Sequence, residues 1–184
     1  DYVAAVELVD VSLLGREEQI AFYINAYNAI TLQTVLNHYP IKRSIVGVGR
    51  PLGVWHIFGI RSKEHIIGGE ELSLDDVEHA ILRVDYDEPR IHLGLVCAAV
   101  SCPTLRNEAY VAARLSEQFD EQGRRFIRSS AGMQIQSLKK KQVIKLSKIF
   151  DWFSRDFQKR QPPEGFFKGV GKKEAAPLYF AWQY

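Results

Sequence analysis

One stretch, residues 90–103, constrains the fold and the chemistry of this chain more than any other part of the sequence. It reads Arg-Ile-His-Leu-Gly-Leu-Val-Cys-Ala-Ala-Val-Ser-Cys-Pro and contains both cysteines of the 184-residue chain, Cys97 and Cys102. The mostly apolar run over 91–96 predicts a short strand, and the small residues after it predict a turn. A thiol between a strand end and a helix start can be activated by backbone N–H groups and by the helix dipole. We therefore expect a functional site here.

The rest of the chain mixes helical and extended patterns in no regular order. Apolar residues at helical spacing predict helices over 17–38, 73–83, 108–128 and 147–161. Extended patterns predict two hairpins, one pairing 55–60 with 64–67 and one pairing 133–136 with 142–145. This order predicts the α+β class. We expect a single domain over 1–184, in which helices pack on a small, mainly antiparallel sheet.

Composition and spacing argue against several kinds of partner. The net charge is +2, and we interpret the acidic stretch over 64–88 and the basic stretch over 139–173 as solvated faces. No nucleic-acid-binding motif accompanies the basic residues. No apolar run reaches the ~20 residues that span a membrane. Two cysteines and one nearby histidine do not match the ligand spacing of a zinc site. We expect no nucleic acid, no membrane span, no metal and no cofactor.

The sequence leaves the state and the partner of the thiols open. Cys97 is either a small buried apolar side chain or a nucleophile, and Cys102 is either a resolving thiol or a disulfide partner. On a regular strand His92 would point to the face opposite Cys97, so the two would meet only if the chain bends, as Gly94 allows. His79 is flanked by apolar residues on a predicted helix, a position usual for a core or rim histidine.

Two asparagines stand inside the predicted helix over 17–38. Asn25 and Asn28 are three residues apart and share a face, although asparagine is a poor residue for a helix interior. They either tie down loops through their amides or, as in Cys-His-Asn sites, orient a catalytic histidine. In the next predicted helix Glu78 precedes His79 but lies about 100° around the axis, so the two cannot form a side-by-side dyad.

Several separated motifs resemble a single family. They are Phe-Tyr-Ile-Asn-Ala-Tyr-Asn-Ala at 22–29, Leu-Ser-Leu-Asp-Asp-Val-Glu-His at 72–79, Glu-Pro-Arg-Ile-His-Leu-Gly-Leu-Val-Cys at 88–97, Ser-Cys-Pro-Thr-Leu-Arg at 101–106 and Leu-Ser-Lys-Ile-Phe-Asp-Trp at 146–152. Over nearly its whole length the chain resembles the domain of unknown function 547 family. The resemblance implies a shared site, whose members here are Asn25, Asn28, Glu78, His79, Arg83 and His92.

The resemblance also implies a type of chemistry. Some members of the family are fused to glutaredoxin-like domains, which implies thiol or glutathione chemistry. Plant members commonly carry Ser at the position of Cys102, which implies that Cys97 is the better candidate for the nucleophile and argues against an obligatory disulfide between the two cysteines. Bacterial relatives are often exported, which favours a periplasmic location. Tyr23 and Ala98 stand where the family usually has Trp and Gly, and neither change removes a candidate catalytic group.

We expect a cysteine-dependent enzyme of the papain or transglutaminase type, acting on an amide, isopeptide or thioester bond. Cys97 would attack as the thiolate, with His92 or His79 as base and general acid. Glu78 or Asn25 would orient that histidine, and backbone N–H groups after Cys97 would hold the oxyanion. Because a histidine before the cysteine is the reverse of papain's order, this expectation requires a circularly permuted papain- or transglutaminase-like arrangement.

The alternative is a binding module that does not turn over its ligand. A pocket for glutathione or another small anionic thiol or peptide would then be lined by Cys97, Asn25, Asn28 and Arg83, with Ser101 and Cys102 as further binding residues. A third interpretation is a scaffold whose polar motifs only hold the fold together. The sequence leaves the oligomeric state open.

Overall fold

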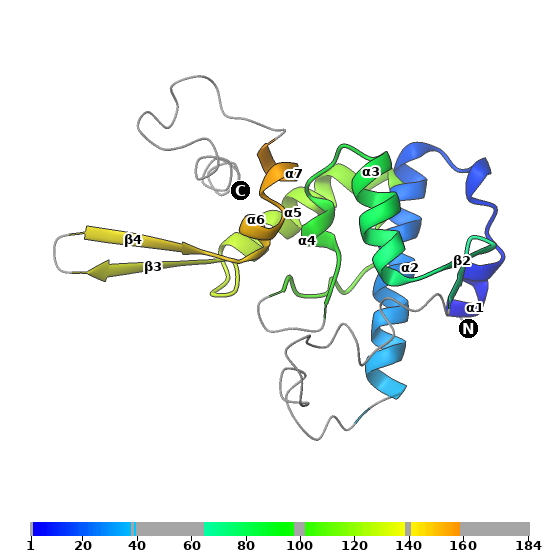
Figure 1. Cartoon of the computed structure of the whole chain (residues 1–184), viewed down its shortest axis with the longest axis horizontal. Coiled ribbons are helices and arrows are strands. Elements are labelled where there is room, and N and C mark those ends of the chain that lie inside the picture. The colour runs from blue at the N-terminus through cyan, green and yellow to red at the C-terminus, as the bar shows by residue number, and fades with distance from the viewer. Residues whose placement is uncertain (1, 38, 40–64, 98–101, 139–140, 159–184) are drawn as a thin grey trace. The chain divides into compact units, whose positions relative to one another are not determined.

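The structure, a computed structural model, describes residues 2–37, 39, 65–97, 102–138 and 141–158 (Figure 1). Its α-helices are α1 (Tyr2–Glu7), α2 (Arg16–Asn37), α3 (Arg83–Asp85), α4 (Ile91–Gly94), α5 (Leu115–Ile127), α6 (Ile149–Trp152) and α7 (Ser154–Gln158). A π-helix, η3, spans Asp76–Leu82, and two 3₁₀ turns are η1 (Val11–Leu13) and η4 (Ala112–Arg114). The strands of the described residues are β1 (His65–Ile67), β2 (Glu70–Leu72), β3 (Met133–Leu138) and β4 (Lys141–Leu146).

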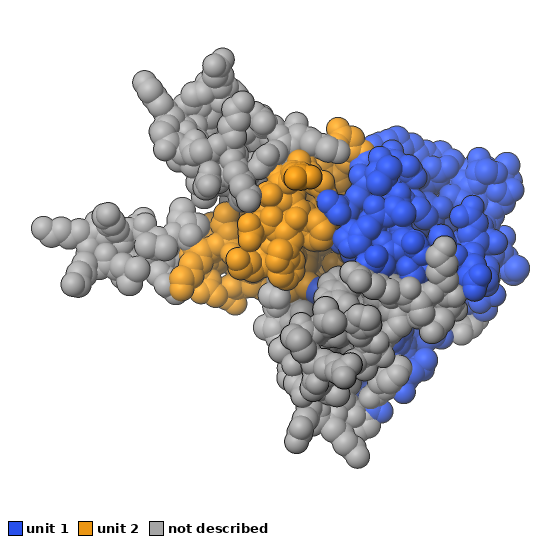
Figure 2. Space-filling view, viewed as in Figure 1, with its two compact units in different colours: residues 1–86, 97–99, 107–115 blue, residues 87–96, 100–106, 116–184 orange. Residues whose placement is uncertain are grey.

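These elements form an α+β architecture, as the sequence predicts. The strands of the described residues form two separate antiparallel hairpins, β1–β2 and β3–β4. The chain divides into two compact units (Figure 2). Unit 1 comprises residues 1–86, 97–99 and 107–115, and unit 2 comprises residues 87–96, 100–106 and 116–184. A single domain over the whole chain stays a prediction.

Helix α2 organises unit 1 and matches the helix predicted over 17–38. Two acidic residues, Glu17 and Glu18, lie in the first turn of α2, where their negative charges interact favourably with the positive end of the helix dipole. The Glu18 carboxylate accepts a hydrogen bond from the Gly15 N–H at 2.7 Å, which caps the helix start. Its largest fully buried side chains are Ile20, Ile24, Tyr27 and Ile30, the spacing of one apolar helix face.

The first hairpin of the described residues joins β1 to β2, with Ile67 opposite Glu70. The predicted pairing of 55–60 with 64–67 stays a prediction, because residues 55–60 lie outside the described residues. The turn between β1 and β2 explains this hairpin. Gly68 and Gly69 both have positive φ, 62° and 80°, as a two-residue hairpin turn requires. A Cβ on Gly68 would also lie 2.4 Å from Val11 Cγ2, so that side of the turn is closed to any larger residue.

The next helix begins where the sequence predicts but has an unexpected pitch. Ser73 and Asp76 cap it reciprocally: Ser73 Oγ accepts from the Asp76 N–H at 3.0 Å, and the Asp76 carboxylate accepts from the Ser73 N–H at 3.0 Å. The helix then widens into η3, in which the Arg83 N–H donates to the Glu78 carbonyl, five residues back. π-Helices are rare in proteins, and those that occur are often found at functional sites. The spacing of apolar residues alone does not distinguish a π-helix from an α-helix.

In unit 2 the predicted strand over 91–96 is wrong, because residues 91–94 form the helical turn α4. The Leu93 N–H donates to the Arg90 carbonyl at 3.0 Å and the Leu95 N–H donates to the Ile91 carbonyl at 3.1 Å. Ile91 and Leu93 are fully buried, and the other four residues of the run are buried too. A short apolar run that is buried on every side carries no periodicity, so strand and helix cannot be told apart from it.

The remaining elements of unit 2 surround an apolar core. The predicted second hairpin is confirmed, with β3 and β4 paired from Met133↔Leu146 to Leu138↔Lys141. The helix predicted over 108–128 is α-helical only from Leu115. The helix predicted over 147–161 is interrupted at Phe153, which separates α6 from α7. The buried core cluster comprises Leu93, Phe126, Ile127, Ile149, Phe150 and Phe157.

Candidate functional site

The structure resolves the state of the two cysteines that the sequence left open. Cys97 and Cys102 are both disulfide-bonded, and because the chain has only these two, the bond joins them to each other. Both residues are partly exposed. In this state Cys97 has no thiolate and cannot act as a nucleophile, so any thiol chemistry requires reduction of the bond first.

His79, on the π-helix, has a charged side chain near each of its ring nitrogens. Its Nδ1 lies 3.2 Å from an Arg83 guanidinium nitrogen, and its Nε2 lies 3.7 Å from the Asp75 carboxylate. Because a guanidinium only donates, Nδ1 accepts, and the proton of the neutral ring is on Nε2, facing Asp75. The side chain is 35% exposed, so solvent and ligands reach it.

Glu78, the residue before His79, faces a different partner. It is buried, and its carboxylate accepts a long hydrogen bond of 3.4 Å from the Tyr27 hydroxyl on α2. Burial, and then the negative charge of Glu78, raise the pKa of Tyr27 well above its ordinary value, so this hydroxyl stays protonated at neutral pH. The carboxylate that faces His79 is instead that of Asp75, which the sequence reasoning missed although its i,i+4 spacing to His79 was visible.

Asn25 ties a distant loop to α2. Its amide nitrogen donates to the Tyr110 carbonyl at 2.8 Å, and its amide oxygen accepts from the Tyr110 N–H at 2.9 Å. The side chain therefore pairs with one backbone unit as a neighbouring strand would, which is the loop-tying role that the sequence left open. Asn28, one turn further along α2, is buried.

His92, in unit 2, is enclosed. Its side chain is 1% exposed, its Nε2 lies 2.8 Å from the Asp156 carboxylate, and its ring stacks on Phe153 with centroids 3.7 Å apart. Asp156 comes from α7, 64 residues later in the sequence. A histidine held this way fixes α7 against α4, and nothing in the sequence pairs these two residues.

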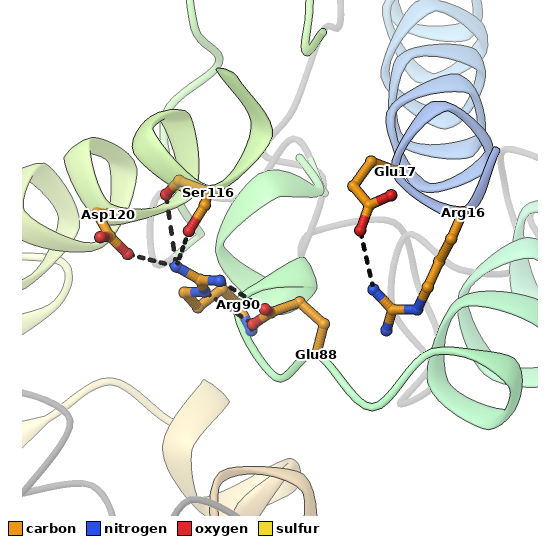
Figure 3. Close-up of polar contacts among 6 residues, drawn as sticks. All are labelled: Arg16, Glu17, Glu88, Arg90, Ser116 and Asp120. Atoms are coloured by element: carbon orange, nitrogen blue, oxygen red, sulfur yellow. Dashed lines mark hydrogen bonds and ion pairs between the residues drawn. The ribbon is translucent and has the colours of Figure 1, made fainter. Parts of the chain in front are cut away.

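A buried arginine just before α4 is a second feature that the sequence reasoning missed. Arg90 forms a two-pronged pair with Glu88, with nitrogen–oxygen distances of 2.8 and 2.6 Å, and also contacts Asp120 and Ser116 on α5 (Figure 3). Its guanidinium lies 5.3 Å from the centre of the Phe119 ring. The cluster anchors the chain segment that leads through α4 to Cys97.

The two units divide the predicted site residues between them. Unit 1 contains Asn25, Asn28, Glu78, His79, Arg83 and Cys97, and unit 2 contains His92 and Cys102. Ser101 lies outside the described residues. In the described part of the chain, no group of three or more His, Cys, Asp or Glu side chains could hold a metal ion. No helix there is both long and apolar enough to cross a membrane.

Comparison with known proteins identifies a family. A family model described as "Protein of unknown function, DUF547" matches residues 11–127, which run from η1 to the end of α5 and include both cysteines. Neither a curated protein nor a solved structure matches the chain. Since the matched range covers more than half of the 184 residues, the chain belongs to the domain of unknown function 547 family.

Proposed function

We propose that this chain is a cysteine-dependent enzyme, a thiol hydrolase or transferase that acts on an amide, isopeptide or thioester bond through Cys97. The supporting observation is His79, a partly exposed imidazole whose two nitrogens are oriented by Asp75 and Arg83, in the same compact unit as Cys97. A carboxylate beside the protonated nitrogen of an imidazole favours the imidazolium that forms when the ring acts as a general base.

The proposed reaction has two steps. The Cys97 thiol loses its proton to His79, and its sulfur bonds to the carbonyl carbon of the substrate. The amine or thiol then leaves with that proton, so an acyl-cysteine remains. Water or a second nucleophile attacks this acyl group and restores the thiol. Water as the acceptor makes the enzyme a hydrolase, and an amine or thiol makes it a transferase.

His79 is the better base of the two candidates because of its surroundings. His92 is almost fully enclosed by Asp156 and Phe153, so its protons do not exchange readily with a substrate. The His79 side chain is 35% exposed, so a substrate can contact it. Its accepting nitrogen, Nδ1, faces the guanidinium of Arg83, and a negatively charged substrate group that attracted Arg83 would uncover that nitrogen.

A binding module for glutathione, or for a similar small thiol or peptide, is the second candidate. It is favoured by the observation that Cys97 is engaged in a disulfide while Arg83, a partly exposed cation, lies in the same unit. Glutathione carries carboxylates that a guanidinium binds well, and its thiol forms mixed disulfides.

The test is acyl transfer to the reduced protein. The chain is reduced with a dithiol, freed of it and mixed with a small acyl thioester, and the acyl adduct is followed by intact mass. We expect one adduct, lost in Cys97→Ser, formed on the order of 100-fold more slowly in His79→Gln and within a few-fold of wild type in His92→Gln. The two histidine variants carry the same substitution and control for each other, provided that circular dichroism shows each folded.

Two results would contradict the proposal. One is acylation of Cys97 no faster than that of a cysteine in the urea-unfolded chain, and the other is an equal rate in His79→Gln and wild type. If the reduced chain forms a mixed disulfide with glutathione disulfide but transfers no acyl group, the binding module replaces the enzyme.

A further inference from the structure

We propose that the Cys97–Cys102 disulfide is a reversible modification site, which a dithiol reduces in the folded protein and thereby releases the Cys97 thiol. The inference rests on the proposed function only for what the released thiol then does. In the oxidised state the chain would be inactive, and in the reduced state it would be active.

The exposure of the bond permits exchange. Both Cys97 and Cys102 are partly exposed, whereas the residues leading to Cys97 on its N-terminal side, Leu95 and Val96, are buried. Thiol–disulfide exchange requires a thiolate to approach one sulfur along the S–S axis, so access decides whether a bond is labile. We infer that the partial exposure of the two residues extends to their sulfurs and gives that access without unfolding.

A dithiol alone supplies the electrons and protons that reduction of the Cys97–Cys102 bond requires. One thiolate of the dithiol attacks a sulfur of the bond, the S–S bond breaks and a mixed disulfide forms. The second thiol then displaces the chain's sulfur and closes a disulfide within the reagent. The dithiol loses two electrons and two protons, and Cys97 and Cys102 gain them as two thiols.

The chain on either side of the bond is anchored by other contacts. Before Cys97, α4 is closed by the bond from the Leu95 N–H to the Ile91 carbonyl. After Cys102, the Gln122 amide donates to the Thr104 carbonyl at 2.7 Å. Reduction of the disulfide breaks neither of these hydrogen bonds.

Further along the chain, one terminal guanidinium nitrogen of Arg106 lies 2.7 Å from the Glu121 carboxylate, and the other donates to the Gln118 carbonyl.

The two cysteines are only five positions apart in the sequence. A disulfide that closes so short a loop constrains the unfolded chain less than a long-range disulfide does. Reduction should therefore leave the fold intact and the two thiols close enough to pair again.

The experiment titrates the folded, full-length protein with mixtures of reduced and oxidised dithiothreitol. Free thiols are trapped with iodoacetamide and counted by mass, and circular dichroism follows the fold. We expect two labels per chain in the reduced state, none in the oxidised state, an unchanged spectrum and recovery of the bond when the ratio is reversed. Cys102→Ser should label at Cys97 without reductant, at least 10-fold faster than oxidised wild type, and Cys97→Ser should do the same at Cys102.

Three results would overturn the inference: reduction only in denaturant, loss of the folded spectrum on reduction, or equal labelling of oxidised and reduced wild type. Acyl transfer by Cys102→Ser separates this inference from the proposed function. If that variant transfers acyl groups while the wild-type bond resists dithiol, the enzyme stands and the modification site fails. If the bond exchanges reversibly but His79→Gln does not alter acyl transfer, the modification site stands and the proposed function fails.

Discussion

Replacing Arg90 by Met should cost this protein a large share of its stability. Arg90 and Glu88 are each 9% exposed at the side chain, and the guanidinium makes two charge-assisted hydrogen bonds to the Glu88 carboxylate. Met matches the length of the aliphatic stem but supplies no charge. The substitution therefore leaves the Glu88 carboxylate buried without its counter-charge.

The size of the effect follows from which partner is buried. Removing one member of a buried ion pair costs about 3–5 kcal/mol, mostly the penalty of the charge left behind. The second carboxylate, Asp120, is 37% exposed, so water screens it and its loss adds at most about 1 kcal/mol. For a chain of this size, 3–5 kcal/mol lowers the melting temperature by roughly 6–20 °C.

The matched control is Arg16→Met, an arginine replaced by the same residue. Arg16 pairs with Glu17 at 3.8 Å, with side chains 51% and 59% exposed, and its guanidinium lies 5.6 Å from the centre of the Tyr86 ring (Figure 3 shows the ion pair). An exposed pair and a weak cation–π contact together contribute ~1 kcal/mol. Urea unfolding of both variants gives the comparison. The reasoning is wrong if Arg90→Met costs no more than Arg16→Met.

A double variant separates the charge left behind from lost packing. Glu88→Gln in the Arg90→Met background removes the uncompensated carboxylate, so it should recover at least about 2 kcal/mol of the loss. In the wild-type background Glu88→Gln should be destabilising, because it leaves the Arg90 cation with a weaker partner. If the double variant is as unstable as Arg90→Met alone, the cost lies in packing around Phe119 and not in charge.

Three further predictions follow from contacts in unit 1. Asn25→Ala removes both hydrogen bonds to the Tyr110 backbone and should cost about 2–4 kcal/mol in urea unfolding, whereas a cost below ~1 kcal/mol would show that the amide does not tie the loop. Because the pKa of Tyr27 is raised in the folded state, this residue ionises first in the unfolded chain, so the contribution of Tyr27 to stability should be constant below pH ~10 and should fall above it. Unfolding of Tyr27→Phe between pH 8 and 12 should show a smaller fall, and an equal fall in both proteins would exclude this tyrosine as its cause. Asp75→Asn should slow acyl transfer to the reduced chain about 10-fold, while Asp85→Asn, an exposed acid further along the same helical segment, should leave the rate unchanged.

The elements that the sequence predicts well are those specified by local signals. The long apolar stripe of α2, the Ser73 cap and the alternation of the β3–β4 hairpin are each contained in a few consecutive residues. The elements that it misses need information from elsewhere in the chain. The run at 91–96 has no period because all of it is buried. The hairpin at 65–72 is different: its signal, the pair Gly68-Gly69, is local, but each of its strands has only three residues.

The site is harder to predict than the fold because its pairs are distant in sequence. Asn25 and Tyr110 are 85 residues apart, and His92 and Asp156 are 64 apart. No periodicity or motif connects such positions. The Asp75–His79 contact is the exception, since four residues on a helix is a local spacing. Glu78, adjacent to the histidine, is the more conspicuous carboxylate in the sequence, but its side chain contacts Tyr27.

The family match provides a further reason to prefer His79 over His92 as the proposed base. The match covers residues 11–127, so it contains Asp75, His79 and Arg83 together. The partner of His92 does not fall within it, because Asp156 lies on α7, beyond β3 and β4. The His79 group and Cys97 therefore lie together in the matched range, whereas a site built on His92 and Asp156 takes one of its members from outside that range.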